Sequence, residues 1–129
     1  MFTVRALLLC QKYEVAEDGQ VDMVLLDGAT APAFPFGLPI KVVAVVDATE
    51  DDLGSTRSAR LELERPDGST GPALPPHEVS FTRSLGGVAV HRAVHELEDV
   101  VFEEAGPHWL RLYVDELPVA RAPLFIDVD

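Results

Sequence analysis

The sequence predicts an all-β fold: a single antiparallel β-sandwich of about seven to eight short strands over residues 1–129. Three observations support this. Apolar and polar residues alternate in several segments, as they do on a strand with one buried face. Glycine-containing turn signals separate these segments at short intervals. Ten prolines in 129 residues leave few windows in which a long helix could form.

A β-hairpin is expected at the start of the chain, from strands at residues 3–15 and 21–26. Gly19 lies between these segments and can adopt the positive φ of a tight turn. The segment 31–39 that follows contains three prolines, which have no N–H group to donate to a sheet. We therefore expect it to cross between the two sheets, with the rings of Phe34 and Phe36 packed beneath it.

The pattern of apolar residues in the middle of the chain predicts three further strands, at residues 40–47, 58–65 and 77–83. A tight turn at Pro66-Asp67-Gly68 and an irregular connection at 71–76 separate the last two. Residues 88–104 support two interpretations, because some apolar residues recur at helical spacing while the β-branched residues favour a strand. We expect a strand followed by irregular chain, since a helix would be exceptional in a sandwich.

The last quarter of the chain has the most regular pattern. Residues 108–114 alternate strictly, and residues 117–129 return after Asp115-Glu116. This pattern predicts a closing β-hairpin. Leu112 is expected on its core-facing side, with Leu110 and Val114, and Trp109 and Tyr113 on the opposite side. The return strand should direct four apolar side chains to the core: Ala120, Leu124, Ile126 and Val128.

The composition makes several classes of partner unexpected. Twenty-two acidic residues against ten basic ones give a formal net charge of −12, which repels nucleic-acid backbones and anionic membrane surfaces. No stretch approaches the ~20 apolar residues of a membrane-spanning helix. Residues 6–10 resemble the end of a lipoprotein signal, but the apolar run is too short and Leu9 precedes the cysteine. With Cys10 as its single cysteine, a buried thiol, the chain is expected to be cytoplasmic.

Two clusters could hold a metal but match no established spacing. His91 and His95 would reach one ion on a helix, where one turn spans about 5.4 Å, but not on a strand, where four residues span about 13 Å. The acidic segment 47–52 offers oxygen ligands for calcium without the spacing of an EF-hand loop. None of the serines lies in a glycine-flanked nucleophile elbow. We therefore expect no metal site, no cofactor and no catalytic residue.

Two of the expected strands are apolar on both faces. Leu8 and Cys10 alternate with Leu7 and Leu9 in the first strand, and residues 42–46 are all apolar in the third. A half-solvated strand should alternate instead. One sheet is therefore expected to have an apolar outer face, covered by the proline-rich crossings, by a partner or by a second copy of the chain.

Several segments resemble a family of small, uncharacterised bacterial proteins. They are Val4–Cys10, Phe34-Pro35, Pro66-Asp67-Gly68, and Gly106 followed by Leu110–Asp115. The sequence departs from that pattern at His108, where an aromatic residue is commoner, and at Asp115-Glu116, which replaces an Asp-Gly turn. The resemblance implies an immunoglobulin-like β-sandwich and implies no activity.

The expected function is therefore non-catalytic: a binding or assembly module that contacts a protein partner or forms a homodimer. The candidate contact residues are Trp109, Tyr113, Phe34 and Phe36. Two alternatives remain open. The chain could bind a small molecule or carbohydrate on Trp109 and Tyr113, which a deep polar pocket would favour. It could also be a metal-assisted enzyme that uses His91 and His95.

Overall fold

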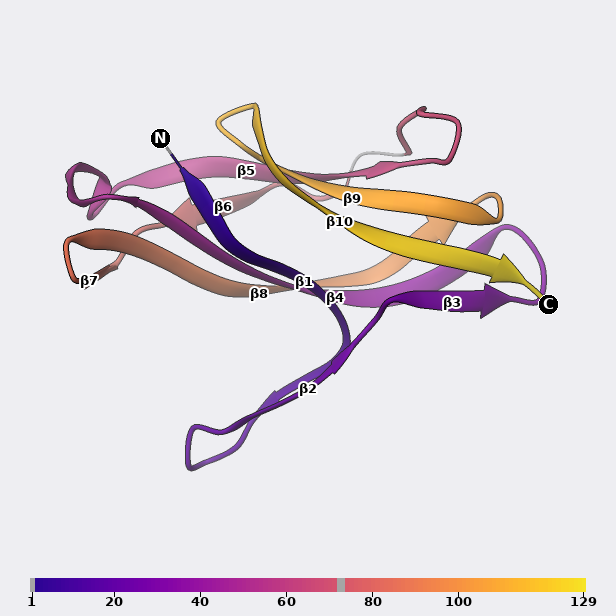
Figure 1. The fold of residues 1–129 in the computed structure, drawn as a ribbon, viewed down its shortest axis with the longest axis horizontal. Coiled ribbons are helices and arrows are strands. Elements are labelled where there is room, and N and C mark those ends of the chain that lie inside the picture. Colours follow the sequence, from indigo (N-terminus) through magenta and orange to yellow (C-terminus); the bar gives the residue numbers. More distant parts are fainter. Residues whose placement is uncertain (1, 72–73) are drawn as a thin grey trace.

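The computed structural model describes residues 2–71 and 74–129, which contain ten strands (Figure 1). The strands are β1 (Thr3–Val15), β2 (Val21–Leu25), β3 (Gly28–Ala31), β4 (Phe36–Thr49), β5 (Thr56–Glu64), β6 (His77–Ser80), β7 (Arg83–Leu85), β8 (Val88–Phe102), β9 (Gly106–Val114) and β10 (Leu117–Val128). A single 3-10 turn, η1 (Glu50–Asp52), follows β4. The prediction of an all-β chain is confirmed, although the described residues form more strands than the seven or eight expected.

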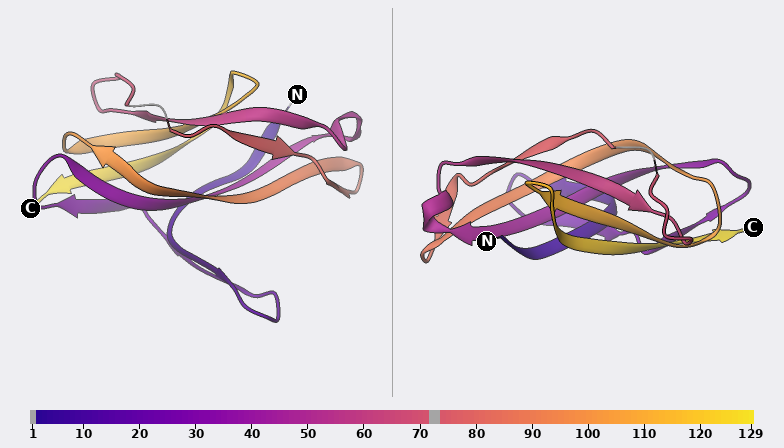
Figure 2. Two further views of the ribbon diagram at one scale, coloured as in Figure 1. Left: turned by 180° about the vertical axis from the view of Figure 1, so that it is seen from behind. Right: turned by 90° about the horizontal axis from the view of Figure 1, so that it is seen from above.

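The strands form two five-stranded sheets (Figure 2). Sheet A has the order β2-β1-β4-β8-β7, and sheet B has the order β3-β10-β9-β5-β6. Every pair of neighbouring strands is antiparallel except β3 and β10, which run parallel. Sheet B is therefore mixed, and the expectation of a wholly antiparallel fold was wrong at this edge.

The crossing expected at residues 31–39 is shorter than predicted. Residues up to Ala31 already pair in sheet B and residues from Phe36 pair in sheet A, so the irregular chain spans only residues 32–35. Pro39 does not end the ladder because the register shifts there, between Leu38 and Ile40, and a bulge needs no N–H donor at this point. Phe34 and Phe36 pack against the core as expected.

Residues 88–104 form the single long strand β8 over most of their length, not a strand followed by irregular chain. The ladder continues past the bulge, where Val100 opposes Leu38 and Phe102 opposes Phe36. The β-branched and aromatic residues in this segment favour the extended form. The helical spacing in the sequence was therefore coincidental.

The strand expected at residues 77–83 is divided between the sheets. Strand β6 pairs in sheet B and β7 pairs in sheet A, so the chain crosses between them at residues 81–82. Phe81 is fully buried at this crossing, and its backbone bonds to the loop before β5: its N–H donates to the Ser55 carbonyl and its carbonyl accepts from Gly54 N–H. The preceding connection at 71–76 lies partly outside the described residues, at 72 and 73.

The two sheets share one hydrophobic core. Val42 from sheet A and Leu61 and Leu112 from sheet B all belong to one buried cluster. The expected alternation in β9 is confirmed, because Leu110, Leu112 and Val114 are all buried. In β10, Ala122, Leu124 and Ile126 are buried, and Ala120 lies on the same face, opposite Leu112, but is only half-buried. Val128 is exposed at the strand end.

The turn between β9 and β10 contains no glycine, although both of its residues adopt positive φ. The φ of Asp115 is 50° and that of Glu116 is 64°, a region that usually favours glycine. Arg57 donates to the Asp115 carboxylate at 3.2 Å, and Arg60 donates to that of Glu116 at 3.1 Å. These ion pairs attach both turn residues to β5. Asp115-Glu116 is the turn at which the sequence departs from the commoner Asp-Gly pair.

Strands β1 and β2 extend beyond the body of the molecule as a two-stranded ribbon, which we call the arm (residues 12–25). The arm leaves on the side of sheet A that faces away from sheet B (Figures 1 and 2). A register shift between Cys10 and Lys12 marks the point at which it leaves. Such a bulge bends the strand and increases its twist.

Candidate functional site

The outer face of sheet A, which faces away from sheet B, is apolar at its centre. Leu8 opposes Val43, and Val43 opposes Val94, so these three side chains form one row across β1, β4 and β8. The residues beside them in sequence, including Leu9 and Val42, belong to the core. The prediction of strands that are apolar on both faces is therefore confirmed.

The apolar row continues onto the arm. Cys10 lies on the same face as Leu8 and opposes Leu25, and Met23 and Val21 follow on that face by alternation along β2. Tyr13 opposes Met23, and Val15 opposes Val21. We call this continuous surface the apolar strip; its residues are Val94, Val43, Leu8, Cys10, Leu25, Met23, Tyr13, Val21 and Val15.

The strip is more exposed on the arm than on the body of sheet A. Cys10 and Val43 are buried, and burial raises the pKa of the Cys10 thiol, as expected of an inert cysteine. On the arm, Leu25 is 51% exposed and Val15 is 57% exposed. Five of the ten exposed large hydrophobic residues in the described chain lie on the arm. The arm therefore presents apolar side chains that nothing else in the described chain covers.

The opposite face of the arm is largely polar. Lys12 opposes Val24, and Glu14 opposes Asp22. The Lys12 ammonium lies 2.8 Å from the Asp22 carboxylate and 3.8 Å from that of Glu14, and the hydrogen bond to Asp22 is the main cause that raises the pKa of Lys12. The arm is thus an amphipathic ribbon.

Charge is distributed differently on the arm and on the outer face of sheet A. The arm carries Lys12 and four carboxylates, those of Glu14, Glu17, Asp18 and Asp22. The outer face carries cations beside carboxylates: Arg5 pairs with Asp47 at 2.8 Å, Lys41 lies near Glu96 at 3.8 Å, Arg83 opposes Val90, Arg92 opposes Val45, and Asp99 lies beside Gly37. Arg92 forms no ion pair within the described part of the chain. This face is therefore close to neutral in an otherwise strongly acidic chain.

The aromatic residues singled out from the sequence lie on the other sheet. Trp109 and Tyr113 are on the outer face of sheet B, as expected, where Arg121 stacks over the Trp109 ring at 4.1 Å and Arg60 over the Tyr113 ring at 3.9 Å. Tyr113 also donates to Glu62 at 3.1 Å. The structure does not bring these rings together with Phe34 and Phe36. An arginine covers one face of each ring that a sugar would need.

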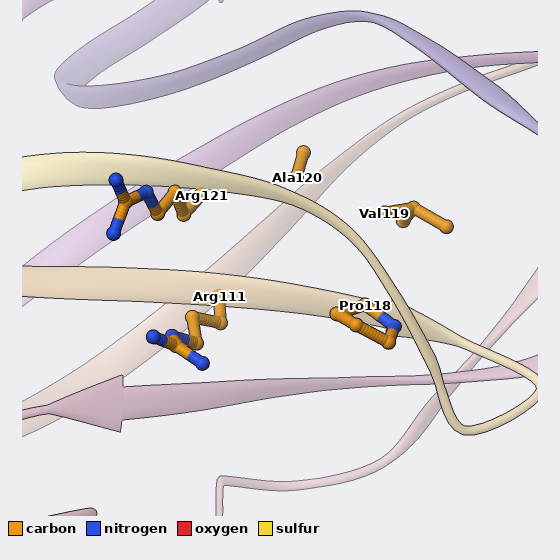
Figure 3. Close-up of a pocket in the computed structure, with 5 residues that line it drawn as sticks. All are labelled: Arg111, Pro118, Val119, Ala120 and Arg121. Carbon is orange, nitrogen blue, oxygen red and sulfur yellow. The ribbon is translucent and has the colours of Figure 1, made fainter.

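A cavity of about 330 Å³ lies beside this face, against the β9–β10 hairpin (Figure 3). Its lining residues are Arg111, Pro118, Val119, Ala120 and Arg121, none of which was a candidate. Arg111 already donates to Glu64 at 2.8 Å. Neither Trp109 nor Tyr113 lines this cavity, so it does not add to the case for a carbohydrate platform.

Three histidines meet at the edge where β6 approaches β8. The rings of His77 and His95 are 3.8 Å apart between centroids, and those of His91 and His95 are 6.3 Å apart. The rings of the two histidines on β8 are therefore closer than the roughly 13 Å that four residues of strand span. His77 is too distant in sequence to have been expected in this group, and β6 of sheet B brings it there.

These imidazoles are poorly provided with hydrogen-bond partners. His91 Nδ1 lies 3.1 Å from the carbonyl oxygen and 3.2 Å from the amide nitrogen of Ser80. The Nε2 atoms of all three rings are buried without a partner among the described residues. Burial, followed by the two neighbouring histidines, lowers the pKa of His77 to about 4, and burial also lowers that of His95.

The rings of His91 and His95 are stacked and that of His77 is tilted against His95, and no group of three potential metal ligands in residues 2–71 and 74–129 is arranged around one point. We therefore expect equimolar zinc to leave the melting temperature unchanged, measured by differential scanning fluorimetry. A zinc-specific rise that His91→Ala abolishes and His108→Ala retains would contradict this, because it would show that the stack opens around an ion.

The remaining candidates have structural partners. His108 is fully buried, with Nδ1 3.0 Å from the Gly106 carbonyl and its ring edge-on to Phe102, so it fills the place of an aromatic core residue. In the acidic segment 47–52, Asp47 pairs with Arg5 and Asp52 pairs with Arg57 at 2.7 Å. Two of the possible calcium ligands are thus engaged by arginine.

These features define an all-β protein with an exposed, apolar arm. The chain belongs to a family of unknown function, DUF6941, whose model matches residues 5–127. The resemblance to an uncharacterised family is therefore confirmed. No curated protein matches the sequence. No helix in the described residues is long and apolar enough to cross a membrane.

The solved structures that are similar to this chain include two from Pseudomonas species. One is the alkylpurine DNA glycosylase AlkC from Pseudomonas fluorescens bound to DNA containing an abasic site analog, with a TM-score of 0.53 and 9% identity; the match covers 98% of this chain and 30% of that chain. The other is an immunoglobulin-like protein from Pseudomonas aeruginosa, with a TM-score of 0.44, 14% identity, and 98% and 96% of the two chains covered. At such identity the likeness to AlkC concerns the fold alone, and this chain spans less than a third of that enzyme.

Proposed function

We propose that this chain is a non-catalytic binding or assembly module and that the apolar strip is its contact surface for another protein chain. The observation that carries the proposal is the arm. Its register places Tyr13, Val15, Val21, Met23 and Leu25 on one face, and most of these side chains are exposed. Contiguous exposed apolar surface with a polar rim is typical of interaction sites.

The architecture of the arm supports the same proposal. A two-stranded ribbon is only marginally stable in water, because it has no second layer against which to bury its apolar face. Here the ribbon also has two unpaired strand edges beyond the point where β1 leaves β4 at Cys10. A partner that covers the apolar face would supply the missing layer.

The proposal extends to the class of fold and the cellular location. The two sheets share one core, and this supports an immunoglobulin-like β-sandwich that forms a single domain. Sandwiches of this kind commonly act as interaction modules, with function set by their surfaces and not by their fold. The acidic composition and single cysteine support a cytoplasmic location.

A photo-crosslinking amino acid placed at Met23 should form covalent adducts with another protein chain, whereas the same group at Val24 should form few. The two positions are adjacent, but Met23 lies on the apolar face of the arm and Val24 on the polar face. The experiment is carried out in cells, and the captured chain is identified by mass spectrometry.

Binding of the captured chain is then measured with purified components by calorimetry. Val21→Asp should weaken it at least tenfold, and Val24→Asp should change it less than twofold. Equal adduct yields at the two positions, or equal effects of the two aspartates, would argue against the strip as the contact surface.

A further inference from the structure

We propose that the chain on the apolar strip is a second copy of this protein, and that the two copies exchange arms across a twofold axis. Each arm lies with its apolar face on the outer face of the other copy's sheet A. This inference rests on the proposed function and names its partner. A twofold contact is the commonest way in which identical chains associate.

The two surfaces match in their apolar content. The arm offers Val15, Val21 and Met23 as exposed side chains, and the outer face offers Leu8 and Val94 as half-buried ones. Both surfaces belong to the same strip and lie on the same face of the sheet, because Cys10 opposes Leu25. An exchanged pair therefore contains two equivalent contacts, each between the arm of one copy and the outer face of the other.

The exchange also explains how so small an arm can form a stable interface. A stable interface commonly involves about 20 to 30 residues a side, far more than one ribbon provides. A reciprocal exchange buries two arms and two outer faces together. The arms leave their bodies on the outer side of sheet A, so each can reach the facing copy without passing around sheet B (Figures 1 and 2).

Charge favours this arrangement over other contacts between two acidic chains. The arm carries four carboxylates against Lys12, whereas the outer face of sheet A carries cations and carboxylates in similar numbers. Arg92 lies in this face, opposite Val45, without an ion pair in the described chain. We assign the carboxylates at the arm tip, Glu17 and Asp18, to the Arg92 of the other copy.

The first test is sedimentation of the purified chain over a concentration series up to the millimolar range. The wild-type chain should form dimers, Val21→Asp should weaken the dimer at least tenfold, and Val24→Asp should leave it within twofold. Circular dichroism and melting temperature confirm that each variant is folded. Added salt should strengthen the wild-type dimer, because it screens the long-range repulsion between two chains of charge −12.

A charge-reversal pair tests the exchange itself. Arg92→Glu alone should be monomeric, since both arm contacts become repulsive, and Glu17→Lys with Asp18→Lys should be monomeric for the same reason. An equimolar mixture of the two variants should form a heterodimer, because both arm contacts then join opposite charges. Only a reciprocal exchange restores both contacts in the mixture.

Three results would overturn the inference: a wild-type chain that stays monomeric at every concentration, a dimer that Val21→Asp leaves intact, or a variant mixture that stays monomeric. A monomeric chain whose Met23 position nevertheless crosslinks to a different protein would overturn only the second copy and would leave the proposed function standing. A chain that is monomeric and forms no such adduct would contradict both the exchanged dimer and the proposed function.

Discussion

Replacing Leu112 with alanine should lower the free energy of unfolding by about 2 to 5 kcal/mol. Leu112 is only 1% exposed and lies in the middle of β9, where it opposes Leu61 on one side and Ala120 on the other. The neighbouring strands hold the walls of the resulting cavity in place, so the site cannot collapse to fill it. Urea unfolding followed by circular dichroism measures the loss.

Leu117→Ala is the matched control for this variant. Leu117 belongs to the same hairpin and loses the same atoms, but it is 61% exposed, so the expected change is within about 0.5 kcal/mol. A loss below about 1 kcal/mol for Leu112→Ala would mean that the inward face of β9 is the one that carries Trp109, Arg111 and Tyr113.

Acidification from pH 7 to pH 4 should destabilise the fold by about 2 to 3 kcal/mol through His77 alone. The unfolded chain binds a proton at this histidine near its ordinary pKa of 6.5, whereas the folded chain binds it only near the lowered pKa of about 4. The unfolded state therefore holds more protons between these values. This contribution is present above pH 6.5 and is lost as the pH falls from 6.5 through the folded-state pKa of about 4.

The measurement is the free energy of unfolding at several pH values for the wild-type chain and for His77→Phe. Phenylalanine can still stack on His95 but cannot take up a proton, so the variant should have a smaller slope between pH 6.5 and pH 4. The carboxylates are common to both chains, and their effect cancels in the difference. Identical slopes for the two chains would show that the stacked rings accept protons without opening.

The strand pattern could be predicted from the sequence because it is a local property. Alternation placed β1 correctly at residues 3–15 and oriented Leu112 inward. Prediction failed where pairing decided the outcome. Pro39 was expected to lie in the crossing between the sheets, but a bulge accommodates it within β4. The irregular chain expected in the later part of residues 88–104 is instead part of β8 as far as Phe102, because β4 pairs with it.

The candidate surfaces were likewise predictable where they depend on local alternation and not where they depend on strand pairing. The alternation of Tyr13, Val15, Val21 and Met23 was present in the sequence and could have identified the arm, but only the structure shows that no other described segment covers it. The grouping of His77 with His95 depends on the order of strands in two sheets, which no short segment encodes. The stacking of Arg60 and Arg121 on the aromatic rings likewise depends on cross-strand register.

The parallel pairing of β3 with β10 has a consequence for how the chain folds. Gly28 opposes Phe125, and a side chain at Gly28 would meet the Phe125 carbonyl oxygen at 2.5 Å, so this early segment is shaped to receive a very late one. Contacts between residues so distant in sequence carry a large loop-closure entropy and slow the search for the native topology. During synthesis, residues 28–31 must remain without their partner strand until residues 125–128 have emerged from the ribosome. The chain must therefore be synthesised through residues 125–128 before this edge of sheet B can form.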